Sequence, residues 1–377
     1  MHWRQLRRPT VLFLVAAISL LWLALRQVTF YAIWQLLGQL EGRQLLNLVA
    51  LNGLILMTMV GRWWLLLLAQ GYNISLGALL RYRLAAFGLT YFTPGPQFGG
   101  EPLQVYLVYE HHNVPLHHAI AAVTLDKMVE MAVNFAFLVC GITFLLNQGI
   151  LYGLWTYGAI ALAILLLAFP LLLFGAYFYG KRPLHAIIDW HEQHKFKHIW
   201  LSPGWLGPLL AAAIESENQA ILLCREQPWL LVGTLLITLF GWGMMVVEFG
   251  YATHLLGTDL TLSAVIGVMV AARVAYLLPM PAGVGTFESA LALAFHWLTH
   301  DPATGLALSV LIRSRDLLLG GIGLWLGGMA LDHHWRPTMS QVGTQLGPRI
   351  FNFYKSFWPT TSVRCAARFV KIKRPGH

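Results

Sequence analysis

Long apolar stretches separated by short polar segments run through most of the chain. Six of them are long enough to cross a bilayer as helices, because about 20 apolar helical residues span a hydrocarbon core of about 30 Å. The predicted crossings are Thr10 to Val28, Leu45 to Ala69, Ala119 to Leu146, Leu151 to Phe178, Trp229 to Gly250 and Ala303 to Leu331. This pattern predicts an all-α, polytopic membrane protein.

Two further apolar regions, Leu79 to Tyr109 and Leu260 to Leu298, are interrupted by proline and glycine. The limbs after the breaks are only about 14 Å and about 20 Å long at 1.5 Å per residue, too short to cross. We therefore expect two re-entrant hairpins, although the limb before the second break, about 28 Å long, leaves open that Leu260 to Leu278 crosses alone. The breaks contain Pro94, Gly99 and Gly100 in the first region and Pro279, Pro281, Gly283 and Gly285 in the second.

The distribution of cationic residues predicts the orientation. With six crossings, the N-terminus, Arg81 and Arg83, the loop from Lys181 to Arg225 and the C-terminal tail share one side, which the positive-inside rule makes cytoplasmic. The two hairpins then enter the membrane from opposite faces. The orientation therefore places both termini in the cytoplasm, as expected for a bacterial inner membrane protein.

The two hairpins look like an inverted repeat. Both contain the pattern Pro-x6-Glu, which ends at Glu101 in one and at Glu288 in the other. Inverted repeats with broken helices that meet near the midplane are typical of transporters. Chance coincidence of two Pro/Gly loops is the alternative.

We expect residues 1–331 to form one membrane domain, with half-repeats at about 45–178 and 229–331 and a cytoplasmic loop at 179–228. Within that loop, Leu206 to Leu223 has the pattern of an amphipathic helix on the membrane surface, with Glu215 and Glu217 facing water. An ordinary connector is the alternative. Residues 332–377 form a basic, aromatic tail that suits an anionic lipid surface.

Charged residues predicted at membrane depth are the candidate site. Each costs about 2 to 3 kcal/mol or more when it faces lipid, so they should face the bundle interior or a wet cavity. Arg62 and Glu248 are interpreted as structural ion pairs. The candidate substrate or translocation residues are Glu101, Asp126, Lys127, Glu130, Arg273, Glu288, Arg313, Arg315 and Asp316.

The chemistry near the breaks favours an anionic ligand. A broken helix exposes backbone N–H groups, and the second limbs begin at Gly100 and Thr286 with partial positive charge. Arg273, Arg313 and Arg315 have the forked donors that suit phosphate. We expect Glu288 to lie with Arg273 and Arg313 in one half, and Glu101 with Asp126, Lys127 and Glu130 in the other. Glu101 and Glu288 have three open roles: capping these helix ends, binding a cationic group, or exchanging protons.

Composition narrows the classes of function. Apolar residues make up 57% of the chain and charged residues 11%, too few to coat a water-soluble protein of 377 residues. Three cysteines without ligand spacing predict neither a disulfide framework nor a zinc site, and we expect no metal or cofactor; metal binding by the histidines of residues 185–198 stays an alternative. The net charge of +9 comes mostly from the tail, so nucleic-acid binding is not expected.

Several of these motifs together resemble a known family. The run Pro94 to Glu101, the Asp126-Lys127-x2-Glu130 helix, the run Pro279 to Glu288, and Arg313 resemble the lysylphosphatidylglycerol synthase transmembrane-region family, also called flippase-like domain proteins. The resemblance covers roughly residues 40 to 330. It implies movement of polar-headed lipids between leaflets, and the short tail implies a stand-alone translocator without the aminoacyl transferase domain.

Our hypothesis is that the chain translocates a polar-headed, anionic lipid through a cavity between the hairpins and is not an enzyme. A noncatalytic subunit of a lipid or glycan biosynthesis complex, with a protein partner or a second copy of the chain, is one alternative. An integral membrane lipid transferase is another, since clustered carboxylates allow general base catalysis. Without a nucleotide-binding loop, an ion or lipid gradient would supply the energy, with Glu130 or Glu288 as proton carrier.

Overall fold

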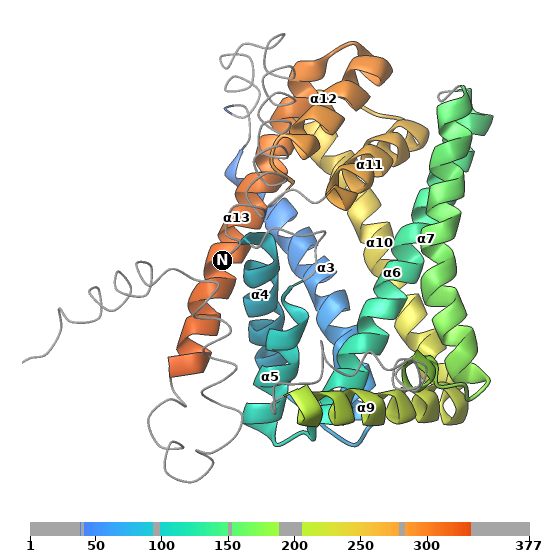
Figure 1. Cartoon of the computed structure of the whole chain (residues 1–377). Coiled ribbons are helices and arrows are strands. Elements are labelled where there is room, and N and C mark those ends of the chain that lie inside the picture. The colour runs from blue at the N-terminus through green and yellow to red at the C-terminus, as the bar shows by residue number, and fades with distance from the viewer. Residues whose placement is uncertain are drawn as a thin grey trace, which may run out of the picture.

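The computed structural model describes residues 38, 41–92, 99–149, 153–187, 206–278 and 283–332 (Figure 1). These residues form helices and no strand, which confirms the predicted all-α class. The crossing at Thr10 to Val28, the break residues Pro94, Pro279 and Pro281, and the tail beyond Asp332 lie outside the described residues. In chain order the helices are α3 (Gly42–Leu68), α4 (Leu76–Phe92), α5 (Glu101–His112), α6 (Leu116–Asn147), α7 (Leu154–Phe178), α9 (Leu206–Glu226), α10 (Pro228–Leu255), α11 (Leu262–Leu277), α12 (Thr286–Thr299) and α13 (Pro302–Asp332).

Within the described residues, four helical segments are long and apolar enough to cross a membrane: Gly42–Leu68, Leu116–Asn147, Thr156–Phe178 and Pro228–Leu255. They coincide with the second to fifth predicted crossings. Helix α13 has 31 residues and runs along the height of the bundle in Figure 1, but three charged residues interrupt its apolar sequence. The chain is therefore a polytopic, helical membrane protein.

The two broken regions are helix pairs in opposite halves of the bundle. Figure 1 shows α4 and α5 in the lower half and α11 and α12 in the upper half. Helix α11 has 16 residues, about 24 Å, which is short of the hydrocarbon core and favours re-entry over a full crossing. This placement is what hairpins of opposite entry require. The inverted repeat itself stays a prediction.

The second limbs are short, as expected. Helix α5 has 12 residues and α12 has 14, about 18 Å and 21 Å. Both end at a residue in the left-handed conformation, Asn113 with φ 52° and His300 with φ 58°. Helix α5 continues three residues beyond Tyr109 because the sequence contains no helix-breaking residue before Asn113.

Small residues join the two halves through the α4–α13 contact. A Cβ atom on Gly323 would lie 1.9 Å from the Leu84 carbonyl oxygen, and one on Gly88 would lie 2.5 Å from the Gly320 carbonyl oxygen. Glycine permits this backbone approach, as it commonly does between membrane helices. Since α13 also packs on α12, it connects the first hairpin to the second.

Helix α9 lies across the lower end of the bundle, below α6, α7 and α10 (Figure 1). Glu215 is exposed as predicted, but the prediction for Glu217 is wrong, because that side chain is only 2% exposed. Its carboxylate accepts the Leu184 N–H at 2.8 Å and the His185 N–H at 3.1 Å. Glu217 thus satisfies the unpaired donors at the start of the helical turn at 183–187.

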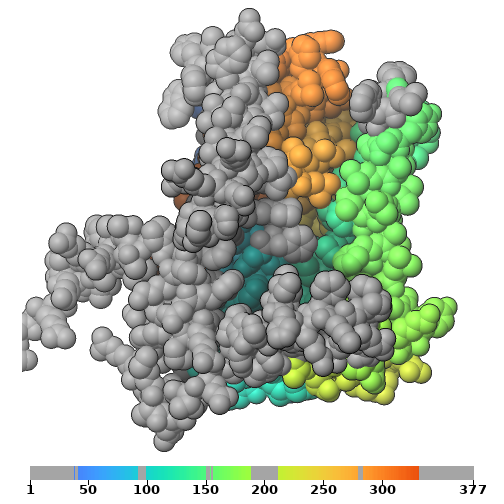
Figure 2. Space-filling model, viewed as in Figure 1, coloured from blue at the N-terminus to red at the C-terminus, as the bar shows by residue number. Residues whose placement is uncertain are grey.

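The side of the molecule seen in Figure 2 is hollowed between α7, in green, and α12, in orange, with teal residues of the first half at the floor. Helix α7 packs on α6 and α9, whereas α12 packs on α11 and α13. Polar residues in this part of the bundle are therefore candidates for a ligand-binding site or a transport route.

Candidate functional site

Asp126 on α6 is held between two arginines from neighbouring helices. Its Oδ1 lies 2.5 Å from Arg62 Nε of α3, and its Oδ2 lies 2.7 Å from Arg83 Nη1 of α4. Asp126 is 2% exposed. A buried carboxylate in apolar surroundings needs such partners, because an isolated ion is strongly disfavoured there.

Glu130, one turn along α6, shares the same partners. Its Oε2 lies 3.3 Å from both Arg62 Nη2 and Arg83 Nη2, and its Oε1 lies 3.3 Å from Lys127 Nζ. Lys127 Nζ also lies 3.3 Å from Glu101 Oε1 of α5. Three cations thus face three carboxylates, and α3, α4, α5 and α6 are tied together by one neutral network, which we call the α6 network: Arg62, Arg83, Glu101, Asp126, Lys127 and Glu130.

Arg83 was missed as a site residue. It was predicted only to lie on the cytoplasmic side, whereas it is 9% exposed and paired with Asp126. Its place inside the apolar run that becomes α4 was the available signal, since a charge there needs a buried partner. Of the two arginines near the start of α4, Arg81 is the exposed one.

Glu101 and Glu288 have matching roles in the two hairpins. Glu101 Oε2 accepts the Gly99 N–H at 2.8 Å, and Glu288 Oε2 accepts the Gly285 N–H at 2.8 Å. Each glutamate therefore caps the dipole at the start of its own second limb, Glu101 from the first helical residue and Glu288 from the third, where the helix dipole favours a negative charge. Each also pairs with a cation of the following helix, Lys127 or Arg313. Of the three open roles, helix capping is the one that both side chains perform.

Arg313 on α13 is fully engaged by the second hairpin. It forms an ion pair with Glu288, with one Nη2–Oε2 distance of 2.9 Å, and the same nitrogen donates to the Gly283 carbonyl at 2.8 Å. Its guanidinium carbon also lies 5.5 Å from the centre of the Phe287 ring. These contacts hold α12 and Gly283 against α13.

Arg315 joins three helices. It pairs with Glu248 of α10 and with Asp316, whose Oδ1 lies 2.9 Å from its Nη2, and it donates to Asn52 Oδ1 of α3 at 2.8 Å. Tyr276 of α11 donates to Asp316 Oδ2 at 3.5 Å. The interpretation of Arg62 and Glu248 as members of ion pairs is thus confirmed by their contacts.

Arg273 on α11 was grouped with Glu288 and Arg313, and this grouping is wrong. Its Nη2 donates to the sulfur of Met245 at 3.0 Å, and its guanidinium carbon lies 4.5 Å from the centre of the Trp242 ring, both on α10. Tertiary packing turns it toward the α6 network instead.

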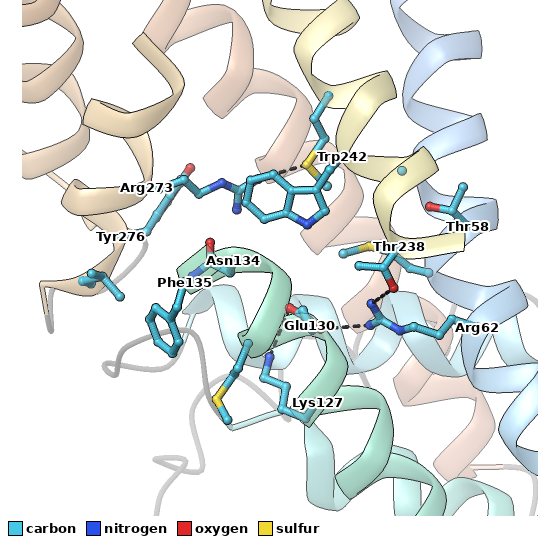
Figure 3. Close-up of a pocket in the computed structure, with 15 residues that line it drawn as sticks. Thr58, Arg62, Lys127, Glu130, Asn134, Phe135, Thr238, Trp242, Arg273 and Tyr276 are labelled. Carbon is cyan, nitrogen blue, oxygen red and sulfur yellow. Dashed lines mark hydrogen bonds and ion pairs between the residues drawn. The ribbon is translucent and has the colours of Figure 1, made fainter. Parts of the chain in front are cut away.

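The part of the chain that the structure describes has a cavity of about 90 Å³ between α3, α6, α10 and α11. Figure 3 shows Arg273 and Trp242 on one side, Arg62, Lys127 and Glu130 on the other, and Asn134 between them. The stripe Asp126, Glu130 and Asn134 on α6 thus leads from the buried ion pairs into the cavity. Its lining is completed by Thr58, Met59, Met131, Phe135, Thr238, Gly241, Met245, Tyr276 and Leu277.

Among the described residues, no group of three or more His, Cys, Asp or Glu side chains is placed to hold a metal ion. His191, His194 and His198, which were considered for that role, lie outside the described residues.

An all-helical bundle of membrane-spanning length, with an ion-pair network and a polar cavity between its helices, defines an integral polytopic membrane protein. The chain matches the family described as the lysylphosphatidylglycerol synthase TM region over residues 10–323, and it belongs to that family. The predicted family is thereby confirmed. No curated protein and no solved structure matches the chain.

Proposed function

We propose that this protein moves a polar-headed, anionic lipid between the two leaflets of its membrane. The observation that carries the proposal is the cavity lined by Arg62, Lys127, Glu130 and Arg273 between helices of membrane-spanning length. A lipid head group costs several kcal/mol or more to place in hydrocarbon, so a translocator must offer polar partners at depth. The acyl chains would remain in the bilayer throughout.

Two arrangements in the structure support alternation between two access states. The hairpins lie in opposite halves of the bundle, and each is secured by an equivalent glutamate cap and cation pair. In transporters with inverted repeats, rocking of one repeat against the other exposes a midplane site to each side in turn. Arg315 would then be the pivot, since it joins α3, α10 and α13.

We place the protein in a bacterial inner membrane with both termini in the cytoplasm and its basic tail on anionic lipid. A noncatalytic subunit role remains the main alternative, because a neutral ion-pair network also suits a rigid scaffold. An enzyme is the weaker alternative, since Glu101, Asp126 and Glu130 are already paired with cations.

Reconstitution into liposomes tests the proposal. Purified protein is incorporated into vesicles that contain fluorescent phosphatidylglycerol, fluorescent phosphatidic acid or fluorescent phosphatidylcholine, and a membrane-impermeant quencher reports transbilayer movement. We expect faster movement of the anionic lipids than in protein-free vesicles. The variant Asn134→Leu, which puts an apolar side chain into the cavity, should lose most of this activity.

Leu236→Ala is the matched control, since this residue of α10 is 61% exposed and does not line the cavity. It should move lipid as the wild type does. Chemical conversion of the lipid without movement would establish an enzyme, and activity that needs an added protein would establish a subunit. Both results contradict the proposal.

A further inference from the structure

Three arginines of the second half were equal candidates for contact with an anion, and their environments separate them. Arg313 is bound by Glu288 and by the Gly283 carbonyl, while Arg315 is bound by Glu248, Asp316 and Asn52. Both guanidinium groups therefore belong to structural ion pairs that join helices. An anion that approached either group would have to displace a carboxylate.

Arg273 has different neighbours. Among the described residues it forms no ion pair with a carboxylate, and its polar contacts are the Met245 sulfur and the face of Trp242. A thioether is a weak acceptor, and a ring face compensates only part of the charge of a guanidinium. Most of its five N–H donors are left for a stronger acceptor.

Arg273 lines the cavity, which offers a place for such an acceptor beside its guanidinium group. Three of the four charged residues of its lining are cationic: Arg62, Lys127 and Arg273, against Glu130. The charge of Glu130 is already balanced by contacts with Arg62, Arg83 and Lys127. Within the described residues, Arg273 is thus the charge of the lining that no ion pair compensates, and the amide of Asn134 offers a further hydrogen bond beside it (Figure 3).

We propose that Arg273 is the anion-binding residue of the cavity, with Trp242 holding its guanidinium and Asn134 assisting, and that its ligand is the phosphate of a lipid head group. This deepens the proposed function and rests on it for the lipid source. A planar fork of donors matches two oxygens of a phosphate group, and such charge-assisted bonds are stronger in surroundings of low dielectric. The Trp242 ring keeps the fork in place by stacking.

Binding measured in neutral detergent tests this separately from transport. The probes are dioctanoyl phosphatidic acid, inorganic phosphate and uncharged dioctanoylglycerol, and affinity is read by calorimetry and by the rise in unfolding temperature. We expect phosphatidic acid to bind the wild type at least tenfold more tightly than dioctanoylglycerol. Arg273→Gln should weaken it by about tenfold or more, the effect of losing one charged hydrogen-bonding partner.

Arg81→Gln is the matched control, because it removes one arginine charge from an exposed position of α4 and should leave affinity unchanged. Arg273→Lys keeps the charge without the fork, so it should give an intermediate affinity, and it serves as the readout if Arg273→Gln does not fold. Inorganic phosphate competing as strongly as the lipid would uphold the anion site and contradict the lipid source. Unchanged phosphatidic acid affinity in Arg273→Gln and Arg273→Lys, or equal binding of dioctanoylglycerol, would overturn the proposal.

The two proposals fail differently. If Arg273 governs phosphatidic acid binding but the wild type moves no lipid in vesicles, the anion site stands and translocation does not. If lipid moves and Arg273→Gln binds it normally, translocation stands and the site must lie elsewhere.

Discussion

Glu288 on α12 binds Arg313 on α13 while it also accepts the Gly285 N–H at the start of its own helix. One carboxylate thus binds the start of α12 and attaches it to α13. Glu101 does the same for the first break with Gly99 and Lys127. The matching pair shows that the glutamates are part of the hairpin architecture, whichever further role they have.

Breaking the Glu288–Arg313 pair from one side should destabilise the fold. In Arg313→Met, the Glu288 carboxylate, with 13% of its side chain exposed, loses its cation, and we expect a loss of about 3 to 5 kcal/mol. Adding Glu288→Gln to the same protein should recover most of it, since the glutamine oxygen still accepts the Gly285 N–H. Thermal unfolding in detergent measures both; a double variant no more stable than Arg313→Met would contradict this account.

Asp126 should matter more for stability than Glu101. Asp126→Asn removes the closer of the two carboxylates that Arg62 and Arg83 share and leaves them only Glu130, at 3.3 Å, so we expect a loss of about 3 to 5 kcal/mol. Glu101→Gln should cost only about 1 kcal/mol, because Glu101 is 24% exposed, its amide oxygen still caps Gly99, and Lys127 keeps Glu130. Unfolding temperatures of the two variants, measured side by side, check the order.

The α4–α13 contact depends on the absence of a side chain at Gly323. In Gly323→Ala the new Cβ would meet the Leu84 backbone, so we expect a loss of about 1 to 3 kcal/mol or failure to fold. Gly321→Ala is the control in the same helix, since nothing lies within 4 Å of its Cβ position, and it should be neutral or stabilising by up to about 1 kcal/mol. Equal stability of the two variants would mean that the helices do not pack this closely.

The proposed orientation can be checked at the two ends of α7. In a cysteine-free protein, Gln148→Cys and Lys181→Cys place single exposed thiols on opposite sides of a 25-residue helix. A membrane-impermeant maleimide should label Gln148→Cys in intact cells and Lys181→Cys only after the cytoplasmic side is opened. The reverse pattern would invert the assigned orientation.

Cys224 on α9 should be inert in the folded protein. Burial raises the pKa of its thiol to about 12, and the thiolate is the reactive form, so almost none is present at pH 8. In a Cys140→Ser, Cys365→Ser protein, we expect no maleimide labelling at pH 8 until denaturant is added. Rapid labelling of the native variant would show that α9 does not bury Cys224 against the bundle.

The sequence by itself determined the class of the fold. It also identified most of the charged residues that lie inside the bundle. Apolar length and Pro/Gly breaks act locally, through the cost of unsatisfied backbone groups in hydrocarbon, so the crossings at α3, α6, α7 and α10 and the short second limbs were predictable. The same cost predicted that Asp126 and Glu130 need buried partners.

Only the tertiary structure decided which charges meet. Arg83 enters the α6 network, Glu217 caps residues 184 and 185, and Arg273 turns away from Glu288 toward Trp242. Ion pairing at membrane depth depends on how helices far apart in the sequence rotate against each other, and periodicity within one helix does not specify that rotation. Packing therefore gives three similar arginines different roles. Arg313 and Arg315 form ion pairs between helices, and Arg273 is the candidate anion-binding residue.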